Sequence, residues 1–116
     1  MASGTFHLKT ATNKQPYWVL RASNGEPLCK SETYSSHAAA LKGIEACKKY
    51  AQDLSNFGLF VGADNLHYWN LKSTGNHEKI CQSEGYTSKQ SANSGALACQ
   101  KDAPNAVIKD DTLANA

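Results

Sequence analysis

Long apolar runs and an excess of one charge are both absent from this sequence, and each absence removes a class of proteins. No run approaches the roughly 18 apolar residues that a transmembrane helix needs, so we expect none and no membrane partner. The formal net charge of +2 is close to neutral and provides no strong field for nucleic acid or an anionic surface. The N-terminus lacks a basic segment followed by an apolar one, so we expect no secretory signal.

The sequence motifs of common enzyme classes are missing as well. There is no nucleophile-elbow pattern, no phosphate-binding loop and no dinucleotide fingerprint. The four histidines are scattered, and nothing pairs one of them with a cysteine as base and nucleophile. We therefore predict a protein that is not an enzyme, with no catalytic residues and no cofactor.

What the sequence does contain is one unit, present twice. Residues 6–26 align with residues 57–77, and residues 27–51 align with residues 79–103, with Glu78 as the additional residue. The identical pairs include Phe6/Phe57, Tyr17/Tyr68, Trp18/Trp69, Cys29/Cys81, Gly43/Gly95 and Cys47/Cys99. The duplication decides the fold but does not reveal the function.

Each repeat is close to the lower size limit for burying a stable core alone. Two halves that share one core are therefore the expected arrangement. We predict a single domain over residues 1–116, with repeat 1 at about 5–56, repeat 2 at about 57–110, and a frayed tail at 111–116.

Apolar periodicity predicts several strands and one helix in each repeat. In the first copy, alternation predicts strands at residues 6–9, 17–22 and 28–31, and helical spacing predicts a helix at about 37–50. Ser36 and Ser88 are placed to cap the helices. The expected inner helix faces are Ala40, Ile44, Cys47 and Ala51 in copy one and Ala92, Ala96, Cys99 and Ala103 in copy two. A last strand is expected at 106–109.

Turn signals separate these strands. Asn24-Gly25 predicts a type I′ hairpin, which needs positive φ at both residues. Its counterpart is Gly75-Asn76, and Asn13-Lys14 and Asp64-Asn65 are further turn candidates. Gly43 and Gly95 fall in mid-helix, where glycine is unfavourable, so we expect a close contact there, between the helices or between each helix and the sheet.

Several of these stretches resemble the YegP-like family. They are residues 23–26 (Ser-Asn-Gly-Glu), 31–36 (Ser-Glu-Thr-Tyr-Ser-Ser), 43–45 (Gly-Ile-Glu), 83–89 and 103–106. The resemblance covers about residues 5–110. It implies an α+β fold of two tandem β-β-β-α-β repeats in one antiparallel sheet, with two helices packed on one face and the C-terminal strands exchanged between repeats. The family has no established activity, so the resemblance implies no catalytic site.

The four cysteines stand at equivalent positions of the repeats, with no Cys-x-x-Cys spacing. Leu28 is expected to face the helices, which places Cys29 on the other side of the sheet, whereas Cys47 lies on the inner helix face. The two thiols of a repeat would then lie on opposite sides of the sheet, as would Cys81 and Cys99. We therefore predict four free thiols in a reducing cytoplasm, with neither a metal site nor a disulfide.

The open face of the sheet is the candidate binding surface. Trp18 and Trp69 are expected in the core, and alternation then sends Tyr17 and Tyr68 to the opposite face. The candidate binding residues are Tyr17, Arg21, Phe60, Tyr68 and Lys72. The same reasoning adds Lys9, Val19, Cys29, Ser31, Asn70, Cys81 and Ser83 to this face.

These observations favour a non-enzymatic binding or accessory module that uses the open face to contact an unknown protein partner or a second copy of itself, because partly apolar faces tend to be covered. Aromatic residues interleaved with Arg and Lys are also what single-stranded nucleic-acid binders use. Weak binding of single-stranded nucleic acid is therefore the alternative function, and the near-neutral charge favours the first.

Overall fold

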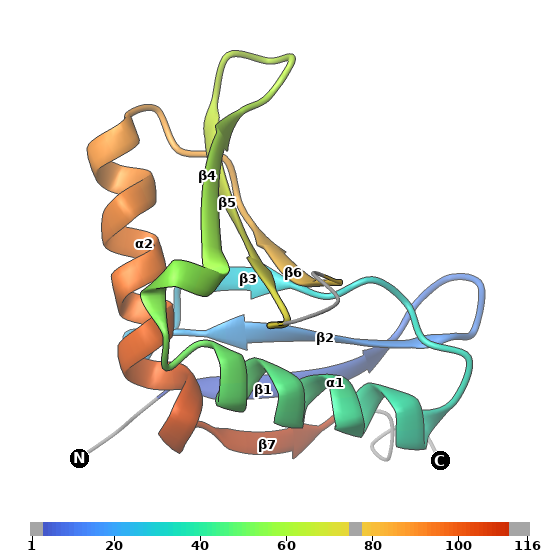
Figure 1. Ribbon diagram of the computed structural model, residues 1–116. Coiled ribbons are helices and arrows are strands. Elements are labelled where there is room, and N and C mark those ends of the chain that lie inside the picture. Colours follow the sequence, from blue (N-terminus) through green and yellow to red (C-terminus); the bar gives the residue numbers. More distant parts are fainter. Residues whose placement is uncertain (1–3, 75–77, 112–116) are drawn as a thin grey trace.

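The computed structural model describes residues 4–74 and 78–111, and their strands form one sheet in the order β4-β5-β6-β3-β2-β1-β7 (Figure 1). The elements are, in chain order, β1 (Thr5–Thr10), β2 (Pro16–Arg21), β3 (Pro27–Lys30), α1 (His37–Tyr50), η1 (Leu54–Asn56), β4 (Phe57–Val61), β5 (His67–Lys72), β6 (Lys79–Ser83), α2 (Lys89–Asp102), η2 (Ala103–Asn105) and β7 (Val107–Asp110). Neither helix in the described part of the chain has the length and apolar character needed to span a membrane.

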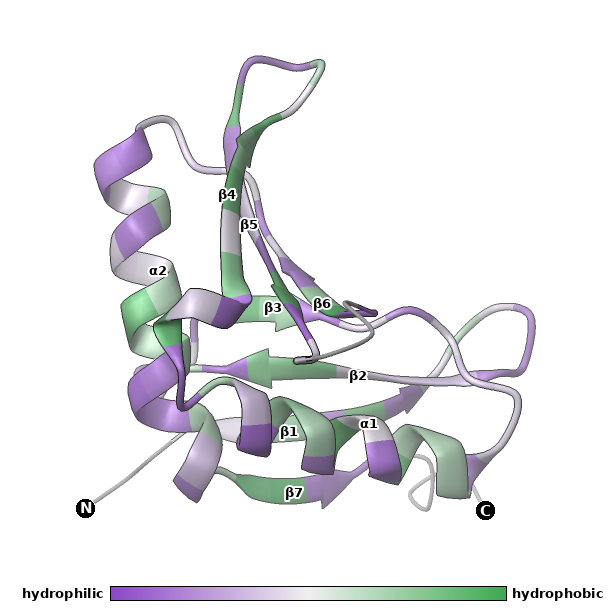
Figure 2. Ribbon diagram, viewed as in Figure 1, coloured by the Kyte–Doolittle hydropathy of each residue, from purple (hydrophilic) through white to green (hydrophobic). Residues whose placement is uncertain are grey.

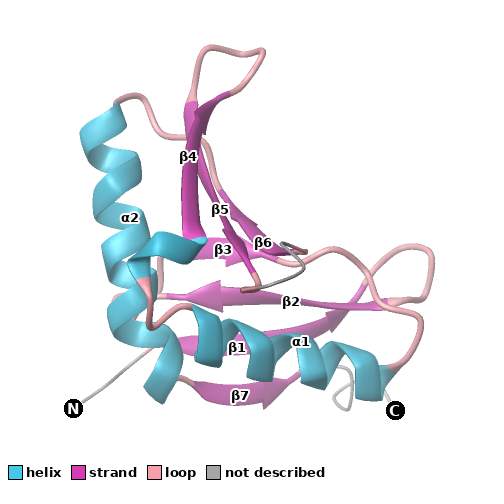
Figure 3. Ribbon diagram, in the orientation of Figure 1, coloured by secondary structure: helices cyan, strands magenta, loops and turns pink. Residues whose placement is uncertain are grey.

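The α+β class and the tandem-repeat organisation are confirmed, with both helices on one face of a twisted sheet (Figure 3). The repeats join where β3 pairs antiparallel with β6. The sheet is mixed rather than wholly antiparallel, because β7 runs parallel to β1. The strand β7, which comes from the end of repeat 2, pairs with the edge of β1 in the parallel direction.

The first two strands of each repeat form a hairpin that carries an aromatic pair. Phe6 and Trp18 meet edge to face with ring centroids 5.3 Å apart, and Phe57 and Trp69 repeat the contact at 5.3 Å. Trp18 and Trp69 are both fully buried, as predicted. Edge-to-face rings add to the burial energy of such large side chains, so these pairs anchor the core.

The described hairpin turns share one geometry. The N–H of Gly25 donates to the carbonyl of Ala22 at 2.8 Å, and within this turn only Gly25 has positive φ, +89°. This is a type I turn followed by a left-handed residue, so the predicted type I′ turn at Asn24-Gly25 is wrong. Lys14 and Asn65 take the same left-handed position at the other two expected turns. Gly75-Asn76 and His77 lie outside the described residues.

The helices begin and pack as predicted. The hydroxyls of Ser36 and Ser88 accept hydrogen bonds from the N–H groups of Ala39 and Ser91 at 3.1 and 3.0 Å. All eight residues expected on the inner helix faces are buried. α2 ends one residue before the short turn η2, which contains a proline.

The mid-helix glycines make room for tyrosines. A Cβ atom on Gly43 would lie 2.0 Å from the Tyr34 hydroxyl oxygen and 3.0 Å from Nε1 of Trp18. At Gly95, the corresponding distance to the Tyr86 hydroxyl is 2.3 Å. The contact is therefore made by the tyrosine that precedes each helix and by the sheet, not by the other helix.

The two repeats differ at their outer edges. β7, the last strand of repeat 2, covers the edge of β1. The segment of repeat 1 that would match β7 instead forms η1 and runs directly into β4, which ends the sheet. Strand exchange thus runs in one direction only in the described chain.

We predict that the chain is one cooperative folding unit, because β1 needs β7 and β3 needs β6. Residues 1–56 and 57–116 expressed separately should lack a cooperative thermal transition as monomers, and mixing them should restore native circular dichroism. Two monomeric halves that each melt independently would contradict this prediction.

We predict that Gly43→Ala destabilises the protein by about 1–3 kcal/mol, the usual cost of adding a methyl group to a filled core. Chemical denaturation measures this change. In a Tyr34→Ala background the same substitution should cost clearly less, since only the tight contact with Nε1 of Trp18 remains and alanine is the better helix former. An equal cost in both backgrounds would exclude the tyrosine contact as the cause.

Candidate functional site

The open sheet face carries the candidate binding residues at two separate places. Tyr17 and Tyr68 are partly exposed on the face opposite the buried tryptophans, as predicted. Phe60 pairs across the strands with Tyr68, and their rings stack with centroids 5.5 Å apart. Tyr17 instead lies under the ammonium of Lys30, 5.2 Å from its ring centroid.

Local contacts fix the orientation of Tyr68. Its hydroxyl donates a hydrogen bond to the carboxylate of Asp64 in the adjoining turn. This bond raises the pKa of Tyr68 and lowers the pKa of Asp64. With Phe60 stacked against it, Tyr68 is held in place rather than free to rotate.

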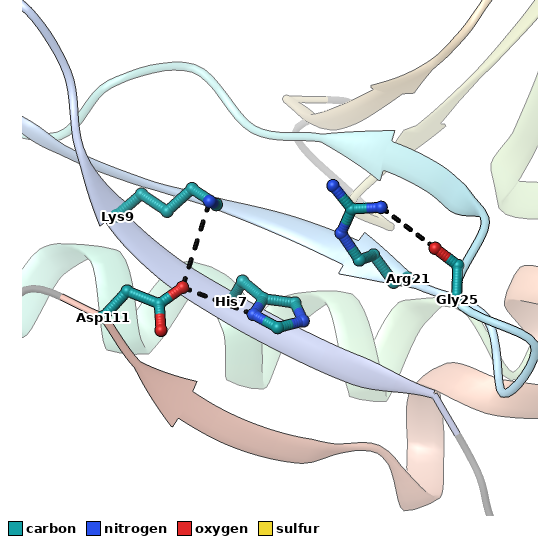
Figure 4. A network of polar contacts seen from close by, with 5 residues as sticks. All are labelled: His7, Lys9, Arg21, Gly25 and Asp111. Carbon is teal, nitrogen blue, oxygen red and sulfur yellow. Dashed lines mark hydrogen bonds and ion pairs between the residues drawn. The ribbon is translucent and has the colours of Figure 1, made fainter.

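The basic residues of this face are only partly available. Arg21 donates from its guanidinium to the carbonyl of Gly25 at 2.9 Å, which ties it to the adjacent hairpin (Figure 4). Lys9 lies 3.9 Å from the carboxylate of Asp111, which also contacts His7 at 3.3 Å (Figure 4). Lys72 is exposed at the end of β5.

Two shallow hollows mark the middle of the face. One, of about 270 Å³, is lined by Tyr68 together with Lys30, Glu32, Lys79 and Gln82. Glu32 forms an ion pair with Lys79 at 3.2 Å. Charges of both signs therefore alternate around the hollow, which gives no continuous positive track for a phosphate backbone.

Four residues assigned to the open face lie in the core instead. Cys29 and Cys81 are 1% exposed, and the side chains of Ser31 and Ser83 accept hydrogen bonds from the N–H groups of Trp18 and Trp69. The reason is a bulge. Leu20 pairs with Cys29 and Arg21 pairs with Pro27, so Leu28 is an extra residue in the strand.

The bulge reverses the facing of every residue that follows it. Since cross-strand partners point to the same side, Cys29 shares the helix-covered face with Leu20, and Cys81 shares it with Leu71. Lys30 and Gln82 face outward in their place.

The bulge thereby brings the cysteines together. The sulfur atoms of Cys29, Cys47 and Cys81 all lie within 4.8 Å of one another, and Cys99 interacts with the thiols of Cys29 and Cys47. All four are buried and free. The placement of the two thiols of a repeat on opposite sides of the sheet is wrong, and it was the reason for expecting no metal site or disulfide.

The thiols influence one another strongly. Burial, reinforced by the neighbouring thiols, raises the pKa of Cys29 well above its usual value. Burial also raises the pKa of Cys81, but hydrogen bonds with Cys29 and Cys47 outweigh it, and the pKa of Cys81 falls to about 7. Hydrogen bonds from neighbouring thiols thus lower the pKa of one member of the group against the effect of burial.

The free edge of β4 is a feature that the sequence analysis missed. Leu8 in β1 is fully buried, whereas its repeat counterpart Leu59 in β4 is 39% exposed. Val61 is 58% exposed. Figure 2 shows β4 as a largely hydrophobic strand at the end of the sheet. The pattern gave no signal for this edge, because pairing at the sheet edge depends on the remote strand β7.

Comparison with known proteins supports the resemblance seen in the sequence. A family model described as "Domain of unknown function (DUF1508)" matches residues 11–57 and 63–110. A UPF0339 protein, YegP, from Yersinia pestis is 38% identical over 113 residues, which cover 97% of this chain and 100% of that protein. A UPF0339 protein from Pasteurella multocida is 38% identical and covers 97% of both chains.

Solved structures show the same fold. The solution structure of YegP from Escherichia coli, described as a protein of unknown function, superposes with a TM-score of 0.89 at 29% identity, covering 96% of this chain and 95% of that one. A UPF0339 protein from Shewanella oneidensis gives a TM-score of 0.85 at 30% identity, covering 94% and 92%.

The two faces of the sheet should respond differently to mutation. We predict that Tyr17→Ala combined with Tyr68→Ala changes the free energy of unfolding by about 1 kcal/mol or less, as surface substitutions usually do. Trp18→Ala should cost about 3–5 kcal/mol, because it empties a large core volume. Urea titration compares them, and a reversed order would invert the assignment of faces.

Proposed function

This chain belongs to the DUF1508 family, whose function is unknown. From the geometry of its sheet, we propose that it is a non-enzymatic module that binds another protein. The partner adds an extended strand to the edge of β4 and covers the adjoining pair of Phe60 and Tyr68 on the open face. The observation that carries this proposal is the difference between β1, covered by β7, and β4, which ends the sheet.

The backbone of β4 presents the groups that strand addition needs. The N–H of Gly62 donates to the carbonyl of Leu66, and the register of β4 with β5 continues from this pair. Antiparallel pairs alternate in hydrogen bonding, so Leu59 and Val61 turn their N–H and carbonyl groups away from β5. The repeat counterpart of Leu59 in β1 is Leu8, which pairs with β7, and its carbonyl accepts a hydrogen bond from the N–H of Asp111.

β4 also lacks the usual protection of an edge strand. Lysine, proline and short length normally discourage pairing at an edge. β4 has five residues, Phe-Gly-Leu-Phe-Val, with no charge and no proline. An extended partner segment with β-branched side chains, like Val107 and Ile108 of β7, has the chemistry that fits this edge.

The cysteines support a non-enzymatic role and a reducing location. All four thiols are fully or almost fully buried, so no substrate can reach them in the native fold. Buried free thiols are typical of proteins kept in reducing compartments. These thiols support our proposal of a cytoplasmic location.

A peptide with the sequence of residues 105–111 (Asn-Ala-Val-Ile-Lys-Asp-Asp) is the matched probe, since β7 occupies the equivalent edge in repeat 1. We predict that titrating it into the ¹⁵N-labelled chain shifts the amides of residues 57–61. Val61→Lys should weaken this binding about tenfold, roughly 1.4 kcal/mol. Val107→Lys is the control at the other edge, 65% exposed against 58% for Val61, and should leave binding unchanged.

Other outcomes of the titration decide between partners. No shift in residues 57–61 at millimolar peptide, with the fold intact, would contradict strand addition. Concentration-dependent dimerisation that Val61→Lys abolishes would identify a second copy as the occupant of the same edge. Salt-sensitive binding of a short oligothymidylate that shifts Tyr17 and leaves β4 unchanged would replace the proposal by the nucleic-acid alternative.

A further inference from the structure

The described residues contain one group of at least three metal-ligating side chains with all ligand atoms close together, the buried thiols of Cys29, Cys47 and Cys81. Cys99 lies beside this group and interacts with the thiols of Cys29 and Cys47, which makes it the candidate fourth ligand. We propose that these four cysteines form a tetrahedral binding site for one Zn²⁺ ion, which links the two repeats. The site does not depend on the proposed protein-binding edge of β4.

The four cysteines lie on four different elements. Cys29 lies on β3 and Cys47 on α1, both from repeat 1, whereas Cys81 lies on β6 and Cys99 on α2, both from repeat 2. β3 and β6 are paired with each other at the centre of the sheet. Two of the cysteines therefore lie on the sheet and two on the helix layer, an arrangement that is compatible with tetrahedral coordination.

The spacing is close to that of a zinc–thiolate site. Zn–S bonds of about 2.3 Å place tetrahedral sulfurs about 3.8 Å apart. The three sulfurs within 4.8 Å of one another reach that spacing by moving less than about 1 Å each toward their common centre. A change of side-chain torsion can move a cysteine sulfur by this much.

Binding would exchange protons for the metal. Each thiol loses its S–H proton to the solvent, and four thiolate sulfurs form bonds to Zn²⁺, with no change in oxidation state. Four thiols and one divalent ion leave two negative charges in the core, half the charge of the uncoordinated thiolates. Four thiolates with no open position form a structural site rather than a catalytic one.

Ordinary core packing and disulfides are the competing explanations. Cysteine often acts as a small buried apolar residue, but packing alone does not require three thiols within 4.8 Å of one another and a fourth beside them. One disulfide would use two sulfurs, and two disulfides would use all four but require an oxidant. A metal ion engages all four sulfurs without any oxidation.

The experiment uses the full chain, reduced, unfolded and refolded with Zn²⁺ or with Co²⁺ as a spectroscopic probe, because the site is closed in the native fold. We predict one tightly held metal ion per chain after gel filtration, the visible absorption of tetrahedral thiolate-bound Co²⁺, and a higher melting temperature. X-ray absorption of the zinc form should show four sulfur neighbours at about 2.3 Å.

Variants separate the cluster from the surface imidazoles. Cys47→Ser and Cys99→Ser should each lose the four-sulfur signature. His37→Ala removes an exposed imidazole that lies 2.7 Å from Asp110, and it should bind the metal as the unchanged chain does.

The spectroscopy of the unchanged chain tests the site even where a cysteine variant fails to fold. A reduced, folded chain that elutes without metal after refolding in excess Zn²⁺ would overturn the proposal. Nitrogen or oxygen neighbours in place of sulfur would overturn it as well. A mass lower by four hydrogen atoms, which shows two disulfides in the chain isolated under native conditions, would also overturn it.

Discussion

The pairing of β3 with β6 is the contact on which the rest of the structure depends. It joins Cys29 to Ser83 and Lys30 to Gln82, and thereby turns two hairpin-and-helix units into one sheet. Each unit alone is close to the lower size limit for burying its own apolar face. Once the central strands pair, both helices can lie on the same face, and the inner sides of both repeats enclose a common core.

The features that could be predicted from sequence are those set by local pattern. Helix α1 was expected at the residues where it lies, since its cap and its apolar spacing are all within one short stretch. The inward tryptophans and outward tyrosines follow from strict alternation along β2 and β5. Because the unit is present twice, each element could be predicted from two stretches of the sequence.

The expectations that were wrong concern features that depend on strand register or on strands distant in the sequence. The bulge at Leu28 inverts the alternation, and the composition of β3 does not predict it. The error moved Cys29, Ser31, Cys81 and Ser83 to the wrong face, and so hid the thiol cluster. The free edge of β4 was missed because it reflects which strand β7 joins, a choice made by the fold as a whole.

The position of β7 has a consequence for how the protein is made. The last described strand along the chain, β7, covers the first, β1. The edge of β1 therefore stays open during synthesis until β7 has been made. Translation proceeds from the N-terminus at a limited rate. During synthesis β1 and β4 therefore both have an uncovered edge until β7 has been made, and β7 covers only the edge of β1.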